Sequence, residues 1–322
     1  MPEPGQNLPA EHEIVAFRHA LLGWWEGNAR DLPWRRTRDP YHILVAEVML
    51  QQTQVDRVIP YYHRWLEAFP DVHVLAAAPT ADVIRLWKGL GYNRRAVNLQ
   101  RSAAAVVERG GAFPESVEEL LNLPGIGPYT AGAIACFAFE QDVPFIDTNM
   151  RRVLHRVFVG SDVPERRASD REVLEIAEAV IPPCDGWRWN QALIEFGALQ
   201  CTARAPACVI CPAQDQCRAR PTIHADILAA AASRKGKAKT LPFEQTNRYF
   251  RGRILDVLRE RDDGSISIDE LGPLVKSDYS AEDLPWLTEL VVALERDGLT
   301  IIAEDESSHD SDGPRSIHVR LP

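Results

Sequence analysis

The sequence predicts an all-α fold that is followed by a small C-terminal unit of helices and strands. Up to about residue 225, apolar residues recur at helical spacing in short stretches, and none of these alternates like a half-buried strand. Proline, glycine and aspartate separate the stretches, as is typical of helix ends. Helices are therefore expected at residues 11–27, 40–55, 56–68, 80–89, 93–109, 115–122, 128–139, 147–158, 169–181 and 187–200.

A change of composition marks the C-terminal unit. A basic linker at 226–242 precedes a helical pattern at 247–261, a short strand that leads into a second helix in SISIDELGPLV, and a third helix in AEDLPWLTELVVALERDG. LTIIAE and RSIHVRLP have the composition of strands, and the acidic EDESSHDSDG between them is expected to be a flexible loop. This order of elements predicts a winged-helix-like domain over residues 243–322.

The charge of the chain is unevenly distributed. The formal net charge is −10, but residues 241–322 hold 18 of the 46 acidic and 9 of the 36 basic residues, which is a net charge of −9. The preceding part is nearly neutral and has basic clusters at Arg94 and Arg95 and around Arg151, Arg152 and Arg156. These clusters are candidates for phosphate contacts, and solvated surface charge is an equal alternative.

Length and hydrophobicity place the chain among globular proteins. With 322 residues, 45% of them hydrophobic, it can bury a sizeable core in two or three compact units. No run of about 18 apolar residues occurs, and the N-terminal MPEPGQNLPAEHEI lacks the features of a secretory signal. The expected location is therefore the cytoplasm.

Four of the six cysteines fall within one short segment. In CTARAPACVICPAQDQC the spacing is C-x6-C-x2-C-x5-C, and the residues are Cys201, Cys208, Cys211 and Cys217. Disulfides are not expected in a cytosolic chain, and a zinc ribbon normally supplies two C-x2-C pairs. Four unevenly spaced thiolates favour a [4Fe-4S] cluster, with a zinc ion or no metal as the alternatives.

The segment LPGIGPYT at 123–130 is a second candidate binding element. Gly125 and Gly127 permit backbone conformations that other residues avoid, and Ile126 between them can enter the core. The hairpin leads into a helix N-terminus, where exposed N–H groups can bind a DNA phosphate without reading a base. A simple tight turn is the alternative.

Several motifs together resemble one family of enzymes. LPGIGPYTAGAIACFAF resembles the helix-hairpin-helix of base-excision DNA glycosylases, and VPFIDTNMRRVL resembles the Asp-bearing segment that follows it. The cysteine spacing resembles the iron–sulfur loop of endonuclease III and its relatives. Within that superfamily, LPWRRTRDPYHILVAEVMLQQTQVDRVIPYYHRW is similar to the MutY branch, the adenine DNA glycosylases. The resemblance runs from about residue 14 to 222.

This resemblance implies an architecture and a reaction. One lobe is a six-helix barrel at 31–142 with the hairpin, and the other combines 1–30 with 143–225 and carries the [4Fe-4S] cluster. Double-stranded DNA lies between the lobes with one base flipped out, because the bond to be cut is inaccessible in the stacked duplex. The implied protein is a nucleoid-associated hydrolase of base excision repair, and its oligomeric state stays open, with a monomer as the default. It removes adenine mispaired with 8-oxoguanine or guanine.

Two carboxyl groups carry the implied chemistry. Glu47 interrupts the apolar run of YHILVAEVMLQQTQV, and on a helix its apolar face would continue into Gln51 and Gln54, as at the wall of a cleft. Apolar surroundings disfavour a charged carboxylate, so Glu47 can hold a proton and give it to N7 of adenine. Asp147 would stabilise the positive charge left on the sugar, and its place before TNMRRVLHRVF also suits a helix N-cap.

Further site residues follow from the same resemblance. Where bifunctional relatives carry a lysine that forms a Schiff base, this chain has Tyr129, which predicts a monofunctional enzyme that does not nick the strand well. Tyr129 and Asn149 would assist the sugar and nucleophile chemistry. Gln52 and Tyr92 would wedge into the duplex near the base opposite the target, although aromatic packing is an alternative for Tyr92. The hairpin glycines would contact the DNA backbone.

The sequence also departs from this family. No counterpart of the usual 8-oxoguanine-recognising domain follows residue 240, so the opposite base stays open, and the acidic unit points to packing or a protein partner. GLGYY reads GLGYN here, with Asn93, and DGN reads DTN, with Thr148. The alternatives are a thymine or uracil mismatch glycosylase of the same superfamily and, more remotely, a non-enzymatic iron–sulfur DNA-binding regulator.

Overall fold

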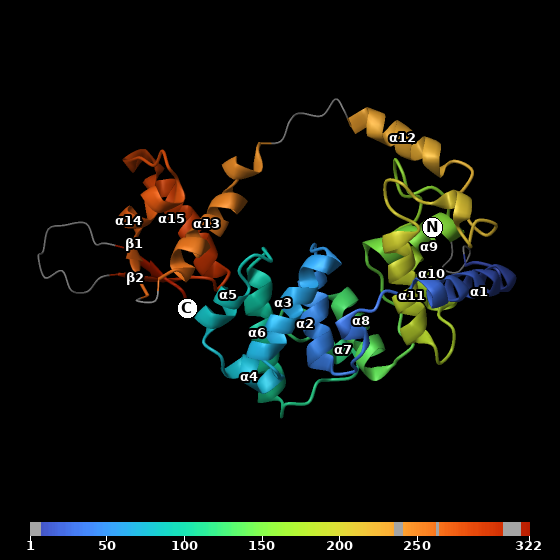
Figure 1. Ribbon diagram of the computed structural model, residues 1–322, viewed down its shortest axis with the longest axis horizontal. Helices are drawn as coiled ribbons and strands as arrows, with labels where there is room; N and C mark the ends of the chain where they lie inside the picture. The colour runs from blue at the N-terminus through green and yellow to red at the C-terminus, as the bar shows by residue number, and fades with distance from the viewer. Residues whose placement is uncertain (1–7, 235–240, 262–263, 305–316) are drawn as a thin grey trace, which may run out of the picture. The chain divides into compact units, whose positions relative to one another are not determined.

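The computed structural model describes residues 8–234, 241–261, 264–304 and 317–322 (Figure 1). Part of the expected linker and almost all of the acidic segment EDESSHDSDG lie outside the described residues. Two compact units form: Met1–Leu44, Pro114–Asn122 and Ile126–Ala238 make the first, and Val45–Phe113, Leu123–Gly125 and Lys239–Pro322 make the second. The lobe boundaries expected from the resemblance stay a prediction. Among the described residues, every helix is too short or too polar to cross a membrane.

The first unit is built from helices. They are α1 (Glu11–Asn28), α7 (Val117–Leu120), α8 (Pro128–Phe139), α9 (Thr148–Phe158), α10 (Asp170–Val180), α11 (Gly186–Leu199) and α12 (Ile223–Arg234), with 3-10 turns η1 (Pro33–Arg35) and η2 (Cys208–Ile210). In its core, Phe17 of α1 meets Phe158 of α9 and Trp189 of α11 edge to face, at ring distances of 5.3 and 5.6 Å. Buried aromatic pairs of this geometry tie the three helices together.

A buried charge cluster fixes the chain that follows α1. Glu195 of α11 is fully buried and binds Arg30 at 2.7 Å and Arg35 at 3.0 Å. Burial opposes the ionisation of Glu195, but hydrogen bonds from both arginines prevail and lower its pKa. The guanidinium of Arg35 also lies 4.7 Å from the ring of Trp25. The segment between α1 and the next helix is thereby held against α11.

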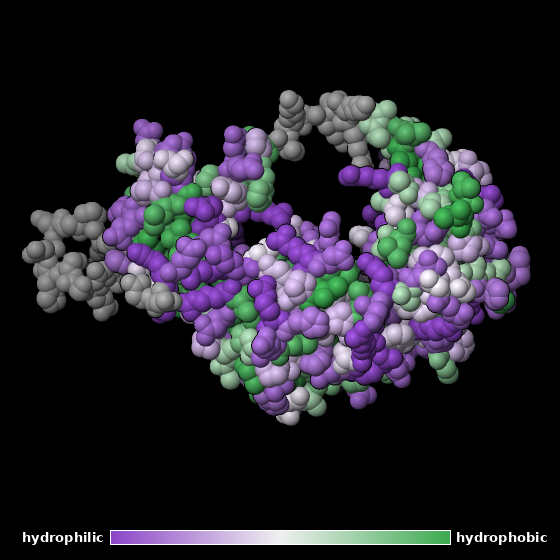
Figure 2. All heavy atoms as spheres, in the orientation of Figure 1, coloured by the Kyte–Doolittle hydropathy of each residue, from purple (hydrophilic) through white to green (hydrophobic). Residues whose placement is uncertain are grey.

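The second unit contains a helical part and the C-terminal domain. Its first helices are α3 (Val55–Ala68), α4 (Val72–Ala77), α5 (Thr80–Leu86) and α6 (Arg94–Glu108), and α2 (Pro40–Leu50) begins in the first unit and ends in the second. Trp65 and Trp87 meet edge to face at 5.3 Å, and both are fully buried. On the face drawn in Figure 2, most surface side chains are hydrophilic, with apolar patches between them.

The C-terminal domain confirms the expected order of elements. It consists of η3 (Phe243–Gln245), α13 (Asn247–Arg259), β1 (Ile266–Ser267), α14 (Ile268–Val275), η4 (Ala281–Asp283), α15 (Leu284–Arg296), β2 (Ile301–Glu304) and β3 (Ile317–Arg320), drawn in orange to red in Figure 1. The strands form an antiparallel sheet in the order β1-β3-β2, with Val319 opposite both Ile266 and Ile302. Three helices and a small sheet in this order make a winged-helix-like domain.

Most expected helices are confirmed, and the differences lie at their ends. The helix expected at 40–55 stops at Leu50, and Gln52 takes a left-handed conformation with φ 56°. The prediction that Gln51 and Gln54 extend the face of Glu47 is therefore wrong, because both residues lie in the turn before α3. Helices α4 and α12 were not expected. Helix α4 has six residues, and tertiary contacts stabilise a helix of that length more than its own propensity does. Helix α12 has 12 residues, most of its described side chains are exposed, and it occupies the first part of the linker expected at 226–242, which corrects that expectation.

We expect Glu195→Gln to lower the free energy of unfolding by about 3 kcal/mol, because the mostly buried Arg35 and the half-buried Arg30 would lose their counter-charge. Urea unfolding curves would measure this. The control is Glu26→Gln, since Glu26 pairs with Arg188 at the surface and is 70% exposed. That exposed pair should contribute less than about 1 kcal/mol. Equal effects of the two changes would contradict the importance of the buried cluster.

Candidate active site and cysteine loop

Glu47 lies on α2 in an apolar environment. It is 6% exposed, and every residue from Ile43 to Met49 is buried. The burial expected for Glu47 is present, but it extends all round the helix and is not limited to one face of it. The role of Glu47 as proton donor stays a prediction.

Arg95 of α6 connects the two loops that carry Gln52 and Tyr92. Its guanidinium donates hydrogen bonds of 2.6 to 3.2 Å to the backbone carbonyls of Val48, Met49, Gln51, Leu90 and Gly91. Burial lowers the pKa of Arg95 to about 10. The interpretation of Arg95 as a phosphate contact is therefore corrected: its donors point inward, to helix and loop ends that would otherwise lack partners.

Gln52 and Tyr92 are both exposed and both have left-handed backbones. Their φ angles are 56° and 47°, in a region that residues other than glycine rarely adopt. Tyr92 follows Gly89 and Gly91, whose φ angles of 98° and 71° make the loop sharply turned. Two strained loops that share one arginine present two side chains to solvent, and such strain is common at binding sites.

The two glycines of the hairpin between α7 and α8 differ: only Gly125 needs to be glycine for its backbone conformation and packing. Gly125 has a φ of 76°, and a Cβ atom there would lie 2.7 Å from the Cβ of Asn98. The expectation that Gly127 needs a glycine-only conformation is wrong, because its φ is −99°. Open space surrounds Gly127, and no side chain caps α8 at this position. Ile126 is buried, as expected. The helix N-terminus thus remains able to receive an anion.

Asp147 is the N-cap of α9. Its carboxylate accepts hydrogen bonds from the backbone N–H groups of Asn149 at 2.9 Å and Met150 at 2.6 Å, and from the side-chain amide of Asn149 at 2.9 Å. Burial raises the pKa of Asp147, and these hydrogen bonds with the charge of Arg152 only partly offset that rise. The cap and the reactive carboxylate are therefore compatible assignments for one side chain.

A chain of hydrogen bonds connects Asp147 to the cysteine loop. Arg152 donates to Oδ1 of Asn149 at 2.8 Å and to the carbonyls of Cys201 and Gly197 at 2.7 and 2.6 Å. A Cβ atom at Gly197 would lie 2.7 Å from the Cβ of Asn149, so the close contact of α9 and α11 requires glycine there. Movement of the cysteine loop would consequently disturb the carboxylate.

Sequence reasoning missed these roles of Arg152 and Gly197. A signal was present in the spacing, because Asn149 and Arg152 stand three residues apart and share one face of a helix. The basic cluster at 151–156 was instead considered for phosphate contacts. Arg152 and Arg156 are mostly buried and serve the cysteine loop, since Arg156 donates to the carbonyl of Thr202 at 2.8 Å and approaches Cys201 Sγ at 3.7 Å.

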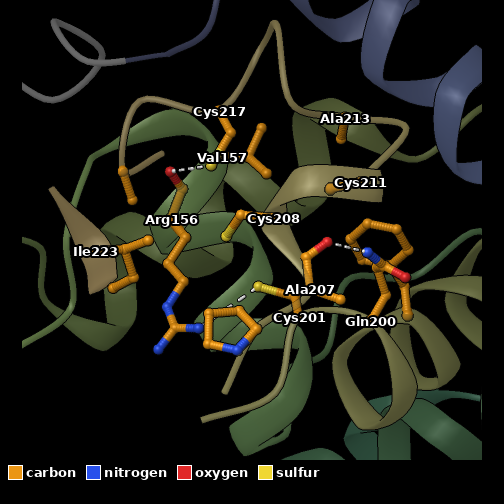
Figure 3. A pocket seen from close by; sticks show the side chains of 13 residues that line it. Arg156, Val157, Gln200, Cys201, Ala207, Cys208, Cys211, Ala213, Cys217 and Ile223 are labelled. Carbon is orange, nitrogen blue, oxygen red and sulfur yellow. Dashed lines mark hydrogen bonds between the residues drawn. The ribbon is translucent and has the colours of Figure 1, made fainter. Parts of the chain in front are cut away.

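The four predicted cysteine ligands line one pocket, between η2 and the ends of α9 and α11 (Figure 3). None of the four forms a disulfide, and burial raises the pKa of each thiol, that of Cys211 to about 11. The carbonyl of Arg156 accepts hydrogen bonds from the backbone N–H of Ala219 at 2.9 Å and from Sγ of Cys217 at 3.4 Å. Within the described part of the chain, no group of three or more metal-binding side chains converges on a single-ion site. The thiols surround a space instead.

The expected site residues fall into groups. Asp147 and Asn149 are hydrogen-bonded, Gln52 and Tyr92 are connected through Arg95, and the ring of Tyr129 packs edge to face on Phe145 at 5.6 Å. Glu47 and Asp147 belong to different compact units, and their pairing across a cleft stays a prediction.

Comparison with known proteins identifies the family of this chain. The family model described as "HhH-GPD superfamily base excision DNA repair protein" matches residues 45–181. An adenine DNA glycosylase of Mycolicibacterium smegmatis is 43% identical over 243 residues, which are 74% of this chain and 79% of that protein. One of Mycobacterium tuberculosis is 38% identical over 291 residues, 88% of this chain and 89% of that protein. The human adenine DNA glycosylase is 43% identical, over 70% of this chain and 43% of its own length.

Solved structures agree with the family. A thermostable thymine-DNA glycosylase is 30% identical with a TM-score of 0.61, over 66% of this chain and 98% of that one. An endonuclease III bound non-covalently to DNA is 25% identical with a TM-score of 0.57, over 65% and 97%. The fold and the hairpin thus define a base excision DNA repair protein of the HhH-GPD superfamily. Within it, the chain belongs to the adenine DNA glycosylases.

We expect Asp147→Asn to fold as stably as the unchanged chain at neutral pH, or more so. Asparagine is an equally good N-cap, and it removes a charge that burial disfavours. Because the pKa of Asp147 is raised in the folded protein, ionisation costs stability above that pKa, and the cost vanishes as the pH falls below the ordinary value of 3.8. The unchanged chain should therefore gain stability relative to Asp147→Asn on acidification.

Thermal unfolding of both proteins between neutral pH and about pH 4 would measure this difference. A large loss of stability in Asp147→Asn at neutral pH would contradict the assignment of a costly buried charge. Base release should fall sharply in the same variant, which separates the functional from the structural role.

Proposed function

We propose that this glycosylase is monofunctional and hydrolyses the N-glycosidic bond of adenine mispaired with 8-oxoguanine or guanine. The observation that carries the proposal is the Asp147 carboxylate, which is desolvated, caps the N-terminus of α9 and is fixed through Asn149 and Arg152. A buried negative charge held rigidly is suited to stabilise a cation that exists only during the reaction.

The proposed reaction begins with the flipped adenine. Glu47 transfers a proton to N7, which makes the base a better leaving group. The bond between the sugar C1′ and N9 then breaks, its electron pair leaves with the adenine, and positive charge develops on the sugar. Asp147 stabilises that charge. Water adds to C1′ and gives up a proton, for which Glu47 is the nearby base in this proposal.

Tyr129 is the reason to expect that the strand stays intact. The phenol cannot form a Schiff base with the sugar, and so the enzyme has no amine at this position to start strand cleavage. The product would be an abasic site. Gly125, Gly127 and the N-terminus of α8 would hold a phosphate of the same strand, while Gln52 and Tyr92 would enter the duplex near the opposite base.

The cysteine pocket fits a [4Fe-4S] cluster in this proposal. It supplies four thiols around a space and the guanidinium of Arg156 beside Cys201, which would offset the negative charge of such a group. The cluster would supply a rigid anchor for residues 201–217. Arg152 would transmit that rigidity to Asp147 through the carbonyl of Cys201.

A second candidate substrate is thymine or uracil opposite guanine. The similarity to a solved thymine-DNA glycosylase supports this alternative. The 38–43% identity to adenine DNA glycosylases favours adenine.

We expect Glu47→Gln to reduce single-turnover base release at least about a hundredfold while DNA binding persists, because the amide has no proton to transfer. The substrates are duplexes with adenine opposite 8-oxoguanine, adenine opposite guanine, and thymine or uracil opposite guanine. Adenine should be released, and nicks should appear only after alkali. The control is Glu67→Gln, since Glu67 is exposed on α3. Nicks without alkali would contradict the monofunctional assignment, and release of thymine or uracil alone would replace the substrate.

We expect Cys211→Ser to abolish iron binding and the visible absorbance of the purified protein, because a four-thiolate group would lose a ligand. Base release should fall with it, as Cys201 would no longer position Arg152. Cys184→Ser is the matched control, since Cys184 is exposed and outside the pocket. Iron and sulfide analysis decides the matter: stoichiometric zinc in place of iron, or iron retained in Cys211→Ser, would be the contrary result.

A further inference from the structure

The C-terminal domain shares a hydrophobic core with the helices that precede Tyr92 and follow it. Ile84 of α5 and Val97 of α6 belong to one buried cluster with Leu258, Leu294 and other residues of that domain. The backbone N–H of Ala81 also donates to the carbonyl of Pro322 at 3.1 Å. All of these residues lie in the second compact unit. The domain is thus packed onto α5 and α6, and the Tyr92 loop connects these two helices.

Arg259 of α13 makes the central polar contact across this shared core. Its side chain is nearly fully buried, and it donates to the carbonyl of Ile84 at 3.1 Å and to Oδ1 of Asn93 at 2.7 Å. Asn93 directly follows Tyr92 and occupies the position at which GLGYY has its second tyrosine. The unusual asparagine therefore has a specific partner, and that partner comes from the C-terminal domain.

The C-terminal domain also touches Tyr92 itself. The guanidinium of Arg248, at the start of α13, lies 4.1 Å from the centre of the Tyr92 ring. Tyr92 is 41% exposed and has a φ of 47°, so its conformation depends on contacts that outweigh the cost of a left-handed backbone. Arg95 supplies such contacts from within the helical part, and Arg248 and Arg259 supply them from the C-terminal domain.

The charge of the C-terminal domain argues that it acts through this loop. Residues 241–322 carry a net charge of −9, which opposes a broad contact with phosphates. A domain of that charge can still influence DNA binding by holding a residue that enters the duplex.

We propose that Arg259 and Arg248 are positioning residues, through which the C-terminal domain holds the Tyr92 loop in the conformation that enters DNA beside the opposite base. The inference rests on the proposed function, because the entry of Tyr92 into the duplex is part of it. Arg259 acts by its hydrogen bond to Asn93, which persists when the ring moves. Arg248 orients the Tyr92 ring before DNA binds. In the complex with DNA, a base stacks on the ring face that the Arg248 guanidinium had covered.

A mutant cycle tests the contact. The background is the full-length Glu47→Gln protein, which is expected to bind DNA without releasing the base. In it, Asn93→Ala and Arg259→Met are made singly and together, each with and without Tyr92→Ala. The probe is a duplex with adenine opposite 8-oxoguanine and 2-aminopurine next to the 8-oxoguanine, whose fluorescence rises when Tyr92 unstacks it. We expect each single change to weaken binding about fivefold and to reduce the fluorescence rise. The double change should weaken binding no more than either single change does. In protein that also carries Tyr92→Ala, Asn93→Ala and Arg259→Met should leave binding and fluorescence unaffected.

Arg253→Met is the matched control. Arg253 lies on the same helix and donates to the carbonyl of Leu274 within the domain, so its loss should leave binding and fluorescence unchanged. Thermal unfolding confirms that each variant is folded. Additive effects, or effects that persist with Tyr92→Ala, would overturn the positioning role. Base release by the protein with Glu47 intact is scored separately. Failure to release adenine would reject the proposed function, and the fluorescence cycle would still decide whether Arg259 positions Tyr92.

Discussion

The main constraint on this fold of short helices is that the carbonyl groups at the helix ends need hydrogen-bond donors. The last turn of each helix leaves carbonyl oxygens without intrahelical partners, and inside a protein they need donors. Arginine side chains supply them at five helices: Arg18 at α10, Arg95 at α2, Arg152 at α11, Arg218 at α9 and Arg259 at α5. All of these arginines except the exposed Arg218 are buried or half-buried. A guanidinium suits this task because its several donors reach more than one carbonyl and its charge complements the helix dipole.

These arginines also organise the candidate site. Arg95 joins the loops of Gln52 and Tyr92, and Arg152 joins the cysteine loop to Asn149 and thereby to Asp147. The same bonds that complete the helix ends therefore position the side chains proposed for DNA contact and for the reaction. A rigid anchor matters most for Asp147, since a desolvated carboxylate can stabilise a short-lived cation only if it is held in place beforehand.

The C-terminal domain gives this adenine DNA glycosylase a distinctive feature. It is acidic, yet it shares a core with α5 and α6 and reaches the loop of Tyr92 through α13. The match to the Mycobacterium tuberculosis glycosylase covers 88% of this chain, so it extends into this domain. Asn93 accepts a hydrogen bond from Arg259 of this domain, so the loop and the domain are directly connected.

The sequence by itself determined the helical fold, the winged-helix-like order at the C-terminus and the family, and it predicts the residues of the site. These features follow from local periodicity and from motifs such as LPGIGPYT and the cysteine spacing, which need no long-range information. It did not determine that α2 ends at Leu50, that Gly127 has an ordinary backbone, or that Arg95 and Arg152 point inward. Only the tertiary structure decided these, because an arginine is exposed or buried according to which carbonyls lie near it, and those carbonyls come from helices distant in the sequence.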